Sequence, residues 1–297
     1  MKSNKILGEL VTFRNASGLN LDGILYSNPS YRATVVHVHG SFGNFYQNQF
    51  LRLMAKMYGE SKINFLSFNL SAHDGIAEGF RYNAETHEDD FEYVGYSVVN
   101  FNSCLDDIKG AINFVKPLCD RIILQGHSLG CDRILYYLLT TKENYDFILI
   151  GPANSYALHS NWAYPITVEE HLSQLKSCSA KVEDYEWLPL DSYGIKQPPA
   201  EVYKIPITRP SLISIMEGPV FQIIRPDSQP SFFIDQNSII FIGGKDGYLT
   251  STSEEMFTFF EKRVRKVTRV YVPNSNHYLE GCEKQVIQKF IDWINGQ

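Results

Sequence analysis

Short apolar runs alternate with stretches of helical spacing along most of this 297-residue chain. The apolar and often β-branched runs predict strands at 33–39, 63–69, 122–125, 147–150, 239–242 and 267–272. Apolar residues that recur every three or four positions predict helices at 50–58, 104–118, 132–139, 253–262 and 283–294. This alternation is typical of a mostly parallel sheet with helices on both faces.

The start of the chain follows a different pattern. Strand-like runs at 6–13 and 19–26 surround Asn15-Ala-Ser-Gly18, whose residue types suit a tight reversal. We therefore expect an antiparallel hairpin to open the fold. With the six later strands it gives an eight-stranded α/β architecture.

The alternation also stops in the middle of the chain. Between 152 and 235 helical spacing is clear only at 167–175, where Thr167 is the expected cap. A structureless loop of that length is unusual inside a compact domain, so we expect an inserted cap. The predicted domains are a core formed by residues 1–154 and 236–297, and a cap at 155–235.

One strand ends in a motif that carries chemistry. The strand at 122–125 runs into Gly126-His127-Ser128-Leu129-Gly130, and a helix follows. This order matches a nucleophile elbow, in which a tight turn lifts a serine hydroxyl clear of the sheet. The two glycines are needed because a Cβ at either position would clash within so tight a turn. Ser128 is therefore the candidate nucleophile.

A serine hydroxyl needs a base, and the base needs an acid to orient it. In parallel sheets such groups gather at the carboxyl ends of the strands. Asp246 follows the strand at 239–242 on a glycine-flanked turn, and His277 follows the next strand. The order Ser128, Asp246, His277 is the one that this arrangement requires. Asp235 precedes its strand and is expected at the opposite edge.

The negative oxygen formed during acyl transfer needs two preorganised donors. The backbone N–H of Leu129 is the first candidate. The second is expected from the loop His39-Gly-Ser-Phe-Gly43, where we favour the N–H of Ser41 over that of Phe42. Histidines in these two motifs have supporting roles: His39 is expected to orient its loop, and His127 to pack rather than react.

Taken together, these motifs resemble a serine hydrolase of the α/β-hydrolase fold. The resemblance rests on His39-Gly40, the Ser128 elbow, Gly243-Gly-Lys-Asp246 and Asn276-His277, and covers the chain apart from the cap. More loosely, the segment 106–112 and the elbow are similar to a poorly characterised esterase-like branch. The chain departs from many relatives at 69–75, where it lacks their Asp-x-Arg-Gly-x-Gly turn.

Composition limits the other classes of function. The net charge is −6, without a block of like charge, so we expect no nucleic-acid partner. No apolar run is long enough for a membrane helix. An odd count of five scattered cysteines favours a reducing compartment, so the expected location is cytoplasmic.

The sequence also indicates no cofactor. A Rossmann glycine fingerprint and a Walker lysine motif are both missing from it. His87-Glu-Asp-Asp90 and His73-Asp74 have no zinc-site spacing, so we read them as a solvated acidic loop that borders the site, and expect no metal.

The leading hypothesis is a cofactor-independent serine hydrolase that cleaves a carboxylic ester or thioester of a moderately apolar, small-molecule acyl compound. Expected substrate contacts are Phe42, His127, Trp162 and Trp187, although the cap aromatics could equally form the cap's own core. A second hypothesis keeps the triad but makes the protein an acyltransferase, a cyclase or an amidase. A third is a ligand-binding protein without turnover. Oligomeric state stays open.

Overall fold

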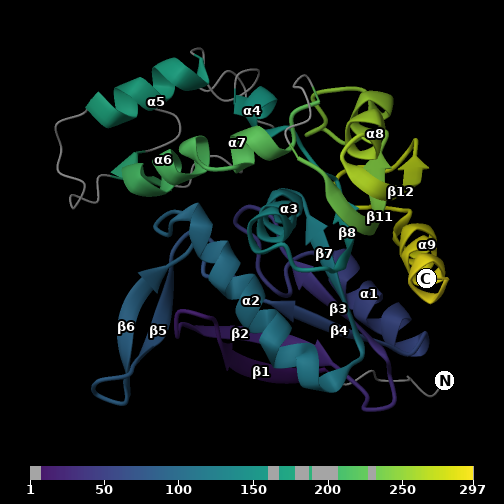
Figure 1. Ribbon diagram of the computed structural model, residues 1–297, viewed down its shortest axis with the longest axis horizontal. Helices are drawn as coiled ribbons and strands as arrows, with labels where there is room; N and C mark the ends of the chain where they lie inside the picture. The colour runs from purple at the N-terminus through teal and green to yellow at the C-terminus, as the bar shows by residue number, and fades with distance from the viewer. Residues whose placement is uncertain (1–7, 160–166, 178–186, 189–206, 227–231, 297) are drawn as a thin grey trace.

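The computed structural model describes residues 8–159, 167–177, 187–188, 207–226 and 232–296. Its centre is an eight-stranded sheet (Figure 1) with the order β1-β2-β4-β3-β7-β8-β11-β12. The strands are β1 (Glu9–Arg14), β2 (Asn20–Tyr26), β3 (Ala33–Val38), β4 (Ile63–Phe68), β7 (Arg121–His127), β8 (Asp146–Ile150), β11 (Ile234–Gly243) and β12 (Val264–Val272). All neighbours from β4 to β12 pair in parallel, and only β2 runs against the rest.

The predicted opening hairpin is confirmed. Strands β1 and β2 pair in antiparallel register, and the turn between them is closed by the side chain of Asn15. Its Oδ1 accepts hydrogen bonds from the backbone N–H groups of Ser17 and Leu19, at 3.0 and 2.9 Å. Gly18 has a φ of +90°, a conformation that suits glycine. The residue types of this turn thus set its geometry.

Helices cover both faces of the sheet, as the alternation predicts. The helices are α1 (Gln49–Glu60), α2 (Cys104–Val115), α3 (Leu129–Thr141), α8 (Ser253–Glu261) and α9 (Glu283–Asn295). One buried apolar cluster joins α2, α3 and α8 to one face, and a second joins α1 and α9 to the other. The sheet is therefore buried on both sides, which explains why its strands read as continuous apolar runs.

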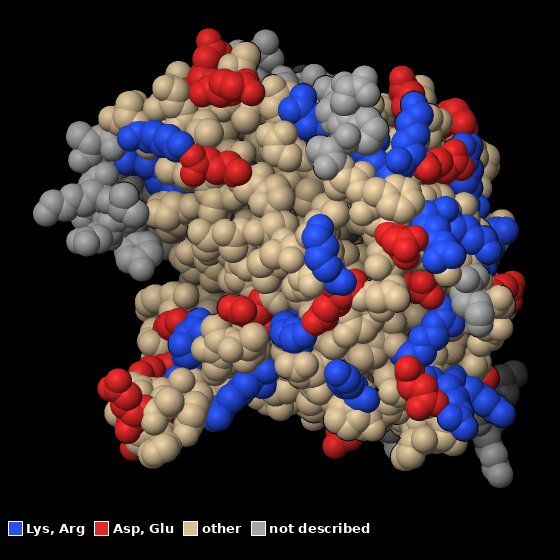
Figure 2. Space-filling model, in the orientation of Figure 1, with Lys and Arg blue, Asp and Glu red and all other residues tan. Residues whose placement is uncertain are grey.

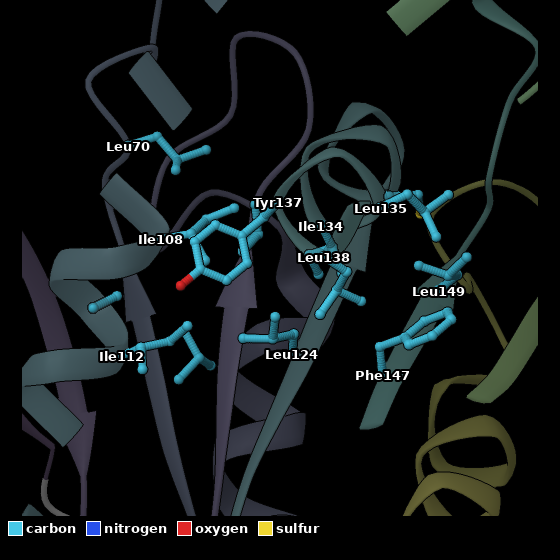
Figure 3. Close-up of a cluster of buried hydrophobic side chains, with 14 of the residues drawn as sticks. Leu70, Ile108, Ile112, Leu124, Ile134, Leu135, Tyr137, Leu138, Phe147 and Leu149 are labelled. Atoms are coloured by element: carbon cyan, nitrogen blue, oxygen red, sulfur yellow. The ribbon is translucent and has the colours of Figure 1, made fainter. Parts of the chain in front are cut away.

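The core beneath α3 holds the turn between β7 and α3 in place (Figure 3). Branched side chains of α2 and α3 pack over the central strands β7 and β8, and all of them are buried. The helical side chains include Ile108, Ile112, Ile134 and Leu138, and those of the strands include Leu124, Phe147 and Leu149. Close packing of this kind keeps α3 and the end of β7 in fixed relative positions.

The segment after β4 differs from its prediction as a loop. It contains a two-stranded hairpin, β5 (Ala77–Asn83) and β6 (Glu88–Val94), which projects at the lower left of Figure 1. Phe80 and Phe91 face each other across the strands, and both are about half exposed. Because most other side chains here are polar, the strand period is weak in the sequence.

The predicted insertion between β8 and β11 is confirmed. It contains α4 (Ser155–Leu158), α5 (Val168–Ser177), α6 (Arg209–Glu217), α7 (Val220–Ile223) and the short strands β9 (Trp187–Leu188) and β10 (Ile207–Thr208). Figure 1 shows these helices above α3. Thr167 caps α5, since its Oγ1 accepts from the N–H of Glu170 at 3.1 Å. The sequence pattern does not predict helices α6 and α7, because both are short and Gly218 and Pro219 separate them.

Charged side chains are mixed on the surface. On the face in Figure 2, basic and acidic residues are interspersed over most of the described elements, and acidic residues gather at the lower left. None of the described helices is long and apolar enough to cross a bilayer.

Candidate active site

Ser128 lies on a strained turn between β7 and α3. Its φ of 55° and ψ of −126° are rare for a residue with a side chain. The turn is held because Ser128 N–H donates to the carbonyl oxygen of Ile150 in β8, at 2.9 Å. The side chain is only partly buried, so this strain exposes the hydroxyl at the carboxyl end of the sheet.

The two glycines of the elbow are required by close backbone contacts. A Cβ on Gly126 would lie 2.5 Å from the carbonyl oxygen of Gly130. A Cβ on Gly130 would lie 2.1 Å from the carbonyl oxygen of Val38. Both separations are too short for real atoms, which confirms the prediction that only glycine fits at these positions.

Asp246 and His277 form a buried pair at the same edge. Asp246 follows β11 and His277 follows β12, and their side chains are 3% and 5% exposed. His277 Nδ1 lies 2.8 Å from Asp246 Oδ2, while Asp246 Oδ1 accepts from the N–H of Tyr248 at 2.9 Å. Since a carboxylate only accepts, His277 carries its proton on Nδ1, which leaves Nε2 free to act as a base.

Backbone contacts bring this pair to Ser128. Gly151 follows Ile150, the residue that binds Ser128 N–H, and a Cβ on Gly151 would lie 2.9 Å from His277 Nδ1. His127, next to Ser128, donates from Nε2 to the carbonyl oxygen of His277 at 3.0 Å. Within the described part of the chain, no hydrogen bond joins Ser128 Oγ to His277. Such bonds are often long without substrate and tighten when it binds.

The loop after β3 lies against Ser128. A Cβ on Gly40 would lie 2.8 Å from Ser128 Cβ and 3.4 Å from Ser128 Oγ, so a side chain here would block the approach. The N–H of Ser41 has no acceptor among the described residues. Leu129 N–H belongs to the first turn of α3, where the helix supplies no acceptor. Both donors are thus available beside Ser128.

Buried groups hold this loop from behind. His39 accepts from Leu70 N–H through Nε2 at 3.1 Å and donates from Nδ1 to the carbonyl oxygen of Gly40 at 2.9 Å. Burial, the largest cause, and the charge of Arg133 hold the pKa of His39 well below its usual value. His39 is therefore a neutral histidine with a fixed tautomer, in agreement with its predicted role in orienting the loop.

The base of the segment after β4 supports the same loop. Asn44 donates to Asp74 Oδ1 at 2.9 Å, and Asn69 Oδ1 accepts from the N–H of Phe45 at 3.0 Å. These bonds bring the base of the segment against the loop after β3, and its place beside the site stays a prediction. The hairpin itself extends away from α3, and His87 at its tip contacts Tyr82.

The predicted substrate contacts have different surroundings. Phe42 is half-buried beside Tyr96, with ring centroids 4.2 Å apart, and has a φ of 52°. His127 is only 2% exposed and packs behind His277. Trp162 lies outside the described residues, and the side chain of Trp187 in β9 does too. The roles of all four stay predictions.

The inserted helices meet the site through Leu129. This side chain is 6% exposed and belongs to an apolar cluster that includes Val168 of α5, Leu212 of α6 and Phe221 of α7. The residue after Ser128 is therefore covered by apolar groups of the insertion. Such cover lowers the access of water and strengthens electrostatic interactions beneath it.

Other candidate groups lie elsewhere. Asp235 is at the amino end of β11, where its Oδ1 lies 3.7 Å from Arg265, as expected for an acid at the opposite edge. His73 contacts Asp74, and the described ranges contain no cluster of three or more possible metal ligands.

Sequence reasoning missed two residues of the site. Gly151 leaves room for the His277–Asp246 pair, and Arg133 binds the carbonyl oxygen of His39 at 2.9 Å. A glycine directly after a predicted strand was a signal for the first. No signal marked the second, because a lone arginine on a helix is normally solvent-exposed.

A scan against protein-family models and a search of curated proteins each find no match. Solved structures do match over nearly the whole chain. Est1E from Butyrivibrio proteoclasticus, with ferulic acid bound, is 14% identical, and the match covers 97% of this chain and 99% of that one, with a TM-score of 0.64. The Pyrococcus furiosus esterase Pf2001 is 14% identical, and the match covers 98% of this chain and 92% of that one, with a TM-score of 0.60.

A third similar structure is the siderophore hydrolase EstB from Aspergillus fumigatus. It is 12% identical, and the match covers 100% of this chain and 99% of that one, with a TM-score of 0.63. These neighbours are esterases or hydrolases, and at such identities the likeness shows the fold alone. Together with the sheet order and the insertion, it shows that this chain has the α/β-hydrolase fold.

Proposed function

We propose that the protein is a cofactor-independent serine hydrolase that cleaves a carboxylic ester or thioester of a moderately apolar acyl compound. The observation that carries this proposal is the bond between His277 Nδ1 and Asp246 Oδ2 at 2.8 Å, made beside the strained turn of Ser128. A Gly-x-Ser-x-Gly turn between a strand and a helix is not by itself evidence of catalysis, because such turns also occur without a catalytic role. A buried acid that fixes the histidine tautomer is what a proton relay needs.

The proposed reaction uses this chain's own groups. Ser128 Oγ attacks the acyl carbon while His277 Nε2 takes its proton, and Asp246 stabilises the resulting imidazolium. The N–H groups of Leu129 and Ser41 stabilise the negative oxygen. His277 then gives the proton to the leaving alcohol or thiol. A water deprotonated by His277 attacks the acyl-enzyme and releases the acid.

The substrate class follows from the cover of the site. Apolar residues of the insertion enclose Leu129, so we propose that residues 155–235 act as a cap over the acyl group. Esterases in complex with ferulic acid or described as siderophore hydrolases have the same fold, which supports a small-molecule ester. The base of the segment after β4 contacts the loop after β3, which supports the proposal that it borders the leaving group.

The proposal is tested with a series of aryl esters and thioesters of increasing acyl length. Ser128→Ala, Asp246→Asn and His277→Gln should each lower kcat by about 10⁴-fold. Asp235→Asn is the matched control, because this acid is exposed at the opposite edge of the sheet. Equal turnover by wild type and Ser128→Ala would contradict the proposal.

Product analysis separates hydrolysis from acyl transfer. The apolar cover around Leu129 limits water, so an amine or alcohol is a reasonable second acceptor. Adding competing nucleophiles should leave the free acid as the main product if hydrolysis is the reaction. A dominant transfer product would favour an acyltransferase with the same three residues. Absence of Ser128-dependent turnover with esters, thioesters and amides would favour a ligand-binding protein.

A further inference from the structure

Arg133 is a buried cation directly behind the candidate oxyanion loop. It lies on α3, five positions after Ser128, and is 1% exposed. Its Nη1 donates to the carbonyl oxygens of His39 at 2.9 Å and Gly40 at 3.3 Å. Burying a guanidinium is costly unless its interactions are specific, so these bonds call for a functional explanation.

Three donors converge on the Gly40 carbonyl oxygen. Besides Arg133, it accepts from His39 Nδ1 at 2.9 Å and from Gly43 N–H at 3.4 Å. The peptide bond from Gly40 to Ser41 is trans, so its C=O and N–H groups point in opposite directions. Because this oxygen is held towards the Arg133 guanidinium, the N–H of Ser41 points away from that guanidinium.

The loop is placed so that this direction matters. Gly40 is in contact distance of Ser128, since a Cβ built on it would lie 3.4 Å from Ser128 Oγ. Ser41 is exposed, and its N–H has no acceptor within the described ranges. A carbonyl oxygen bound next to Ser128 would meet a donor whose orientation was set before binding, which is what lowers the cost of oxyanion stabilisation.

The charge of Arg133 adds to this effect. Burial lowers the pKa of Arg133, but a guanidinium stays protonated at neutral pH. The buried carboxyl groups of Asp107 and Asp132 interact with it electrostatically, although neither forms a hydrogen bond with it. A charge-assisted bond from Nη1 is stronger than a neutral one, so it holds the carbonyl oxygens of His39 and Gly40 more firmly than a neutral donor would.

We propose that Arg133 is a positioning residue of the oxyanion hole. By holding the carbonyl oxygens of His39 and Gly40, it turns the N–H of Ser41 towards the oxygen that becomes negative during acyl transfer. This inference rests on the proposed serine-hydrolase function and adds to it a residue that does not touch the substrate. It also selects Ser41 over Phe42 as the second donor.

The test compares Arg133→Met, which keeps the volume of the chain but removes every donor, with Arg133→Lys, which keeps the charge but not the fork. Arg133→Met should lower kcat by about 10²-fold with little change in KM. Arg133→Lys should recover part of that loss. The affinity for a trifluoromethyl ketone, which forms an oxyanion on Ser128, should fall in parallel with kcat/KM. The affinity for the corresponding alcohol should not change.

Arg263→Met is the matched control. Arg263 is 2% exposed and also donates from Nη1 to a helix carbonyl oxygen, that of Phe259 at 3.1 Å, but it precedes β12 at the opposite edge of the sheet. Its substitution should lower Tm without changing the ratio of ketone to alcohol affinity.

If Arg133→Met does not fold, Arg133→Lys takes its place. The ratio of ketone to alcohol affinity of Arg133→Lys should be severalfold lower than that of wild type.

The outcomes separate this inference from the function beneath it. If wild type shows Ser128-dependent turnover but both Arg133 variants keep the wild-type ratio of ketone to alcohol affinity, the positioning role is wrong and the hydrolase proposal stands. A lower Tm with an unchanged ratio would likewise assign Arg133 to stability alone. If wild type shows no Ser128-dependent turnover, the function itself fails.

Discussion

Gly151 and His277 are so close that a single methyl group on Gly151 would clash with the His277 ring. A Cβ built on Gly151 would lie 2.9 Å from His277 Nδ1 and 3.2 Å from Asp246 Oδ2. The backbone of Gly151 also has a φ of +59°, which residues with a side chain rarely adopt. The end of β8 thus supplies no catalytic group, but it supplies the space in which the histidine and its acid meet.

Gly151→Ala should therefore damage the relay more than the fold. The new methyl group displaces His277 from Asp246, and a shift of the order of 1 Å costs about 10²-fold in kcat. Kinetics with a good ester substrate, together with Tm, measure both effects. Gly247→Ala is the control, because a Cβ there meets no atom within 4 Å. Full activity of Gly151→Ala would show that the close contact between Gly151 and His277 is not needed for activity.

Ser128→Gly should stabilise the protein while abolishing its activity. The φ of 55° at Ser128 strains a serine but not a glycine, and relief of such strain is worth about 1–2 kcal/mol. Ser128→Ala, which keeps the Cβ and therefore the strain, should be inactive without this gain. Chemical denaturation of the two variants and wild type measures the difference. If Ser128→Gly is no more stable than Ser128→Ala, the turn is not strained.

His127→Phe should weaken the placement of His277. The ring still packs against Phe50, but the donor to the carbonyl oxygen of His277 at 3.0 Å is lost. One hydrogen bond of this kind is worth about 1 kcal/mol, so kcat should fall by up to tenfold with KM nearly unchanged. A rise in KM at constant kcat would instead support the predicted substrate contact.

Buried His37 should make the fold less stable in acid. Burial lowers the pKa of His37 to about 3, from an ordinary value of 6.5. Above about pH 6.5 both states are neutral and stability is complete. As the pH falls further, the unfolded chain binds a proton that the folded chain does not, and stability is lost until the pH reaches about 3.

His37→Gln tests this sign directly. Glutamine keeps an acceptor for Gln125, whose Nε2 donates to His37 Nδ1 at 2.9 Å, but it does not titrate. On acidification, the variant should bind up to one proton fewer on unfolding than wild type. Its unfolding free energy should therefore fall less steeply with pH, by up to about 1.4 kcal/mol per pH unit. Urea denaturation across the acidic range measures it. Identical pH dependence in both proteins would contradict the neutral, buried state of His37.

The positions of residues at strand ends could be predicted, because the alternation of strands and helices along the sequence indicates the topology of the sheet. The alternation predicts parallel strands, and parallel strands bring their carboxyl ends to one edge. Asp246 and His277 follow two of these strands directly, and the structure pairs them at 2.8 Å. The turn of Asn15 and the capping of α5 by Thr167 could be predicted for a similar reason, since both depend on local hydrogen bonds.

Features set by tertiary contacts could not be predicted. Arg133 is buried only because α3 packs beneath the loop that follows β3, and nothing in its neighbours along the chain indicates this. The β5–β6 hairpin is held by side-chain pairs such as Arg81 with Glu92, whose polarity hides the strand period. Helices α6 and α7 are short, and they pack into the apolar cluster around Leu129, which their local sequence does not reveal.

The central claim is that Ser128 is a nucleophile activated by His277, and covalent labelling tests it most directly. A fluorophosphonate should modify the wild-type protein once, and peptide mass spectrometry should locate the adduct on Ser128. Ser128→Ala should stay unlabelled, and His277→Gln should react far more slowly. Equal labelling of wild type and Ser128→Ala, or an adduct on another residue, would contradict the account.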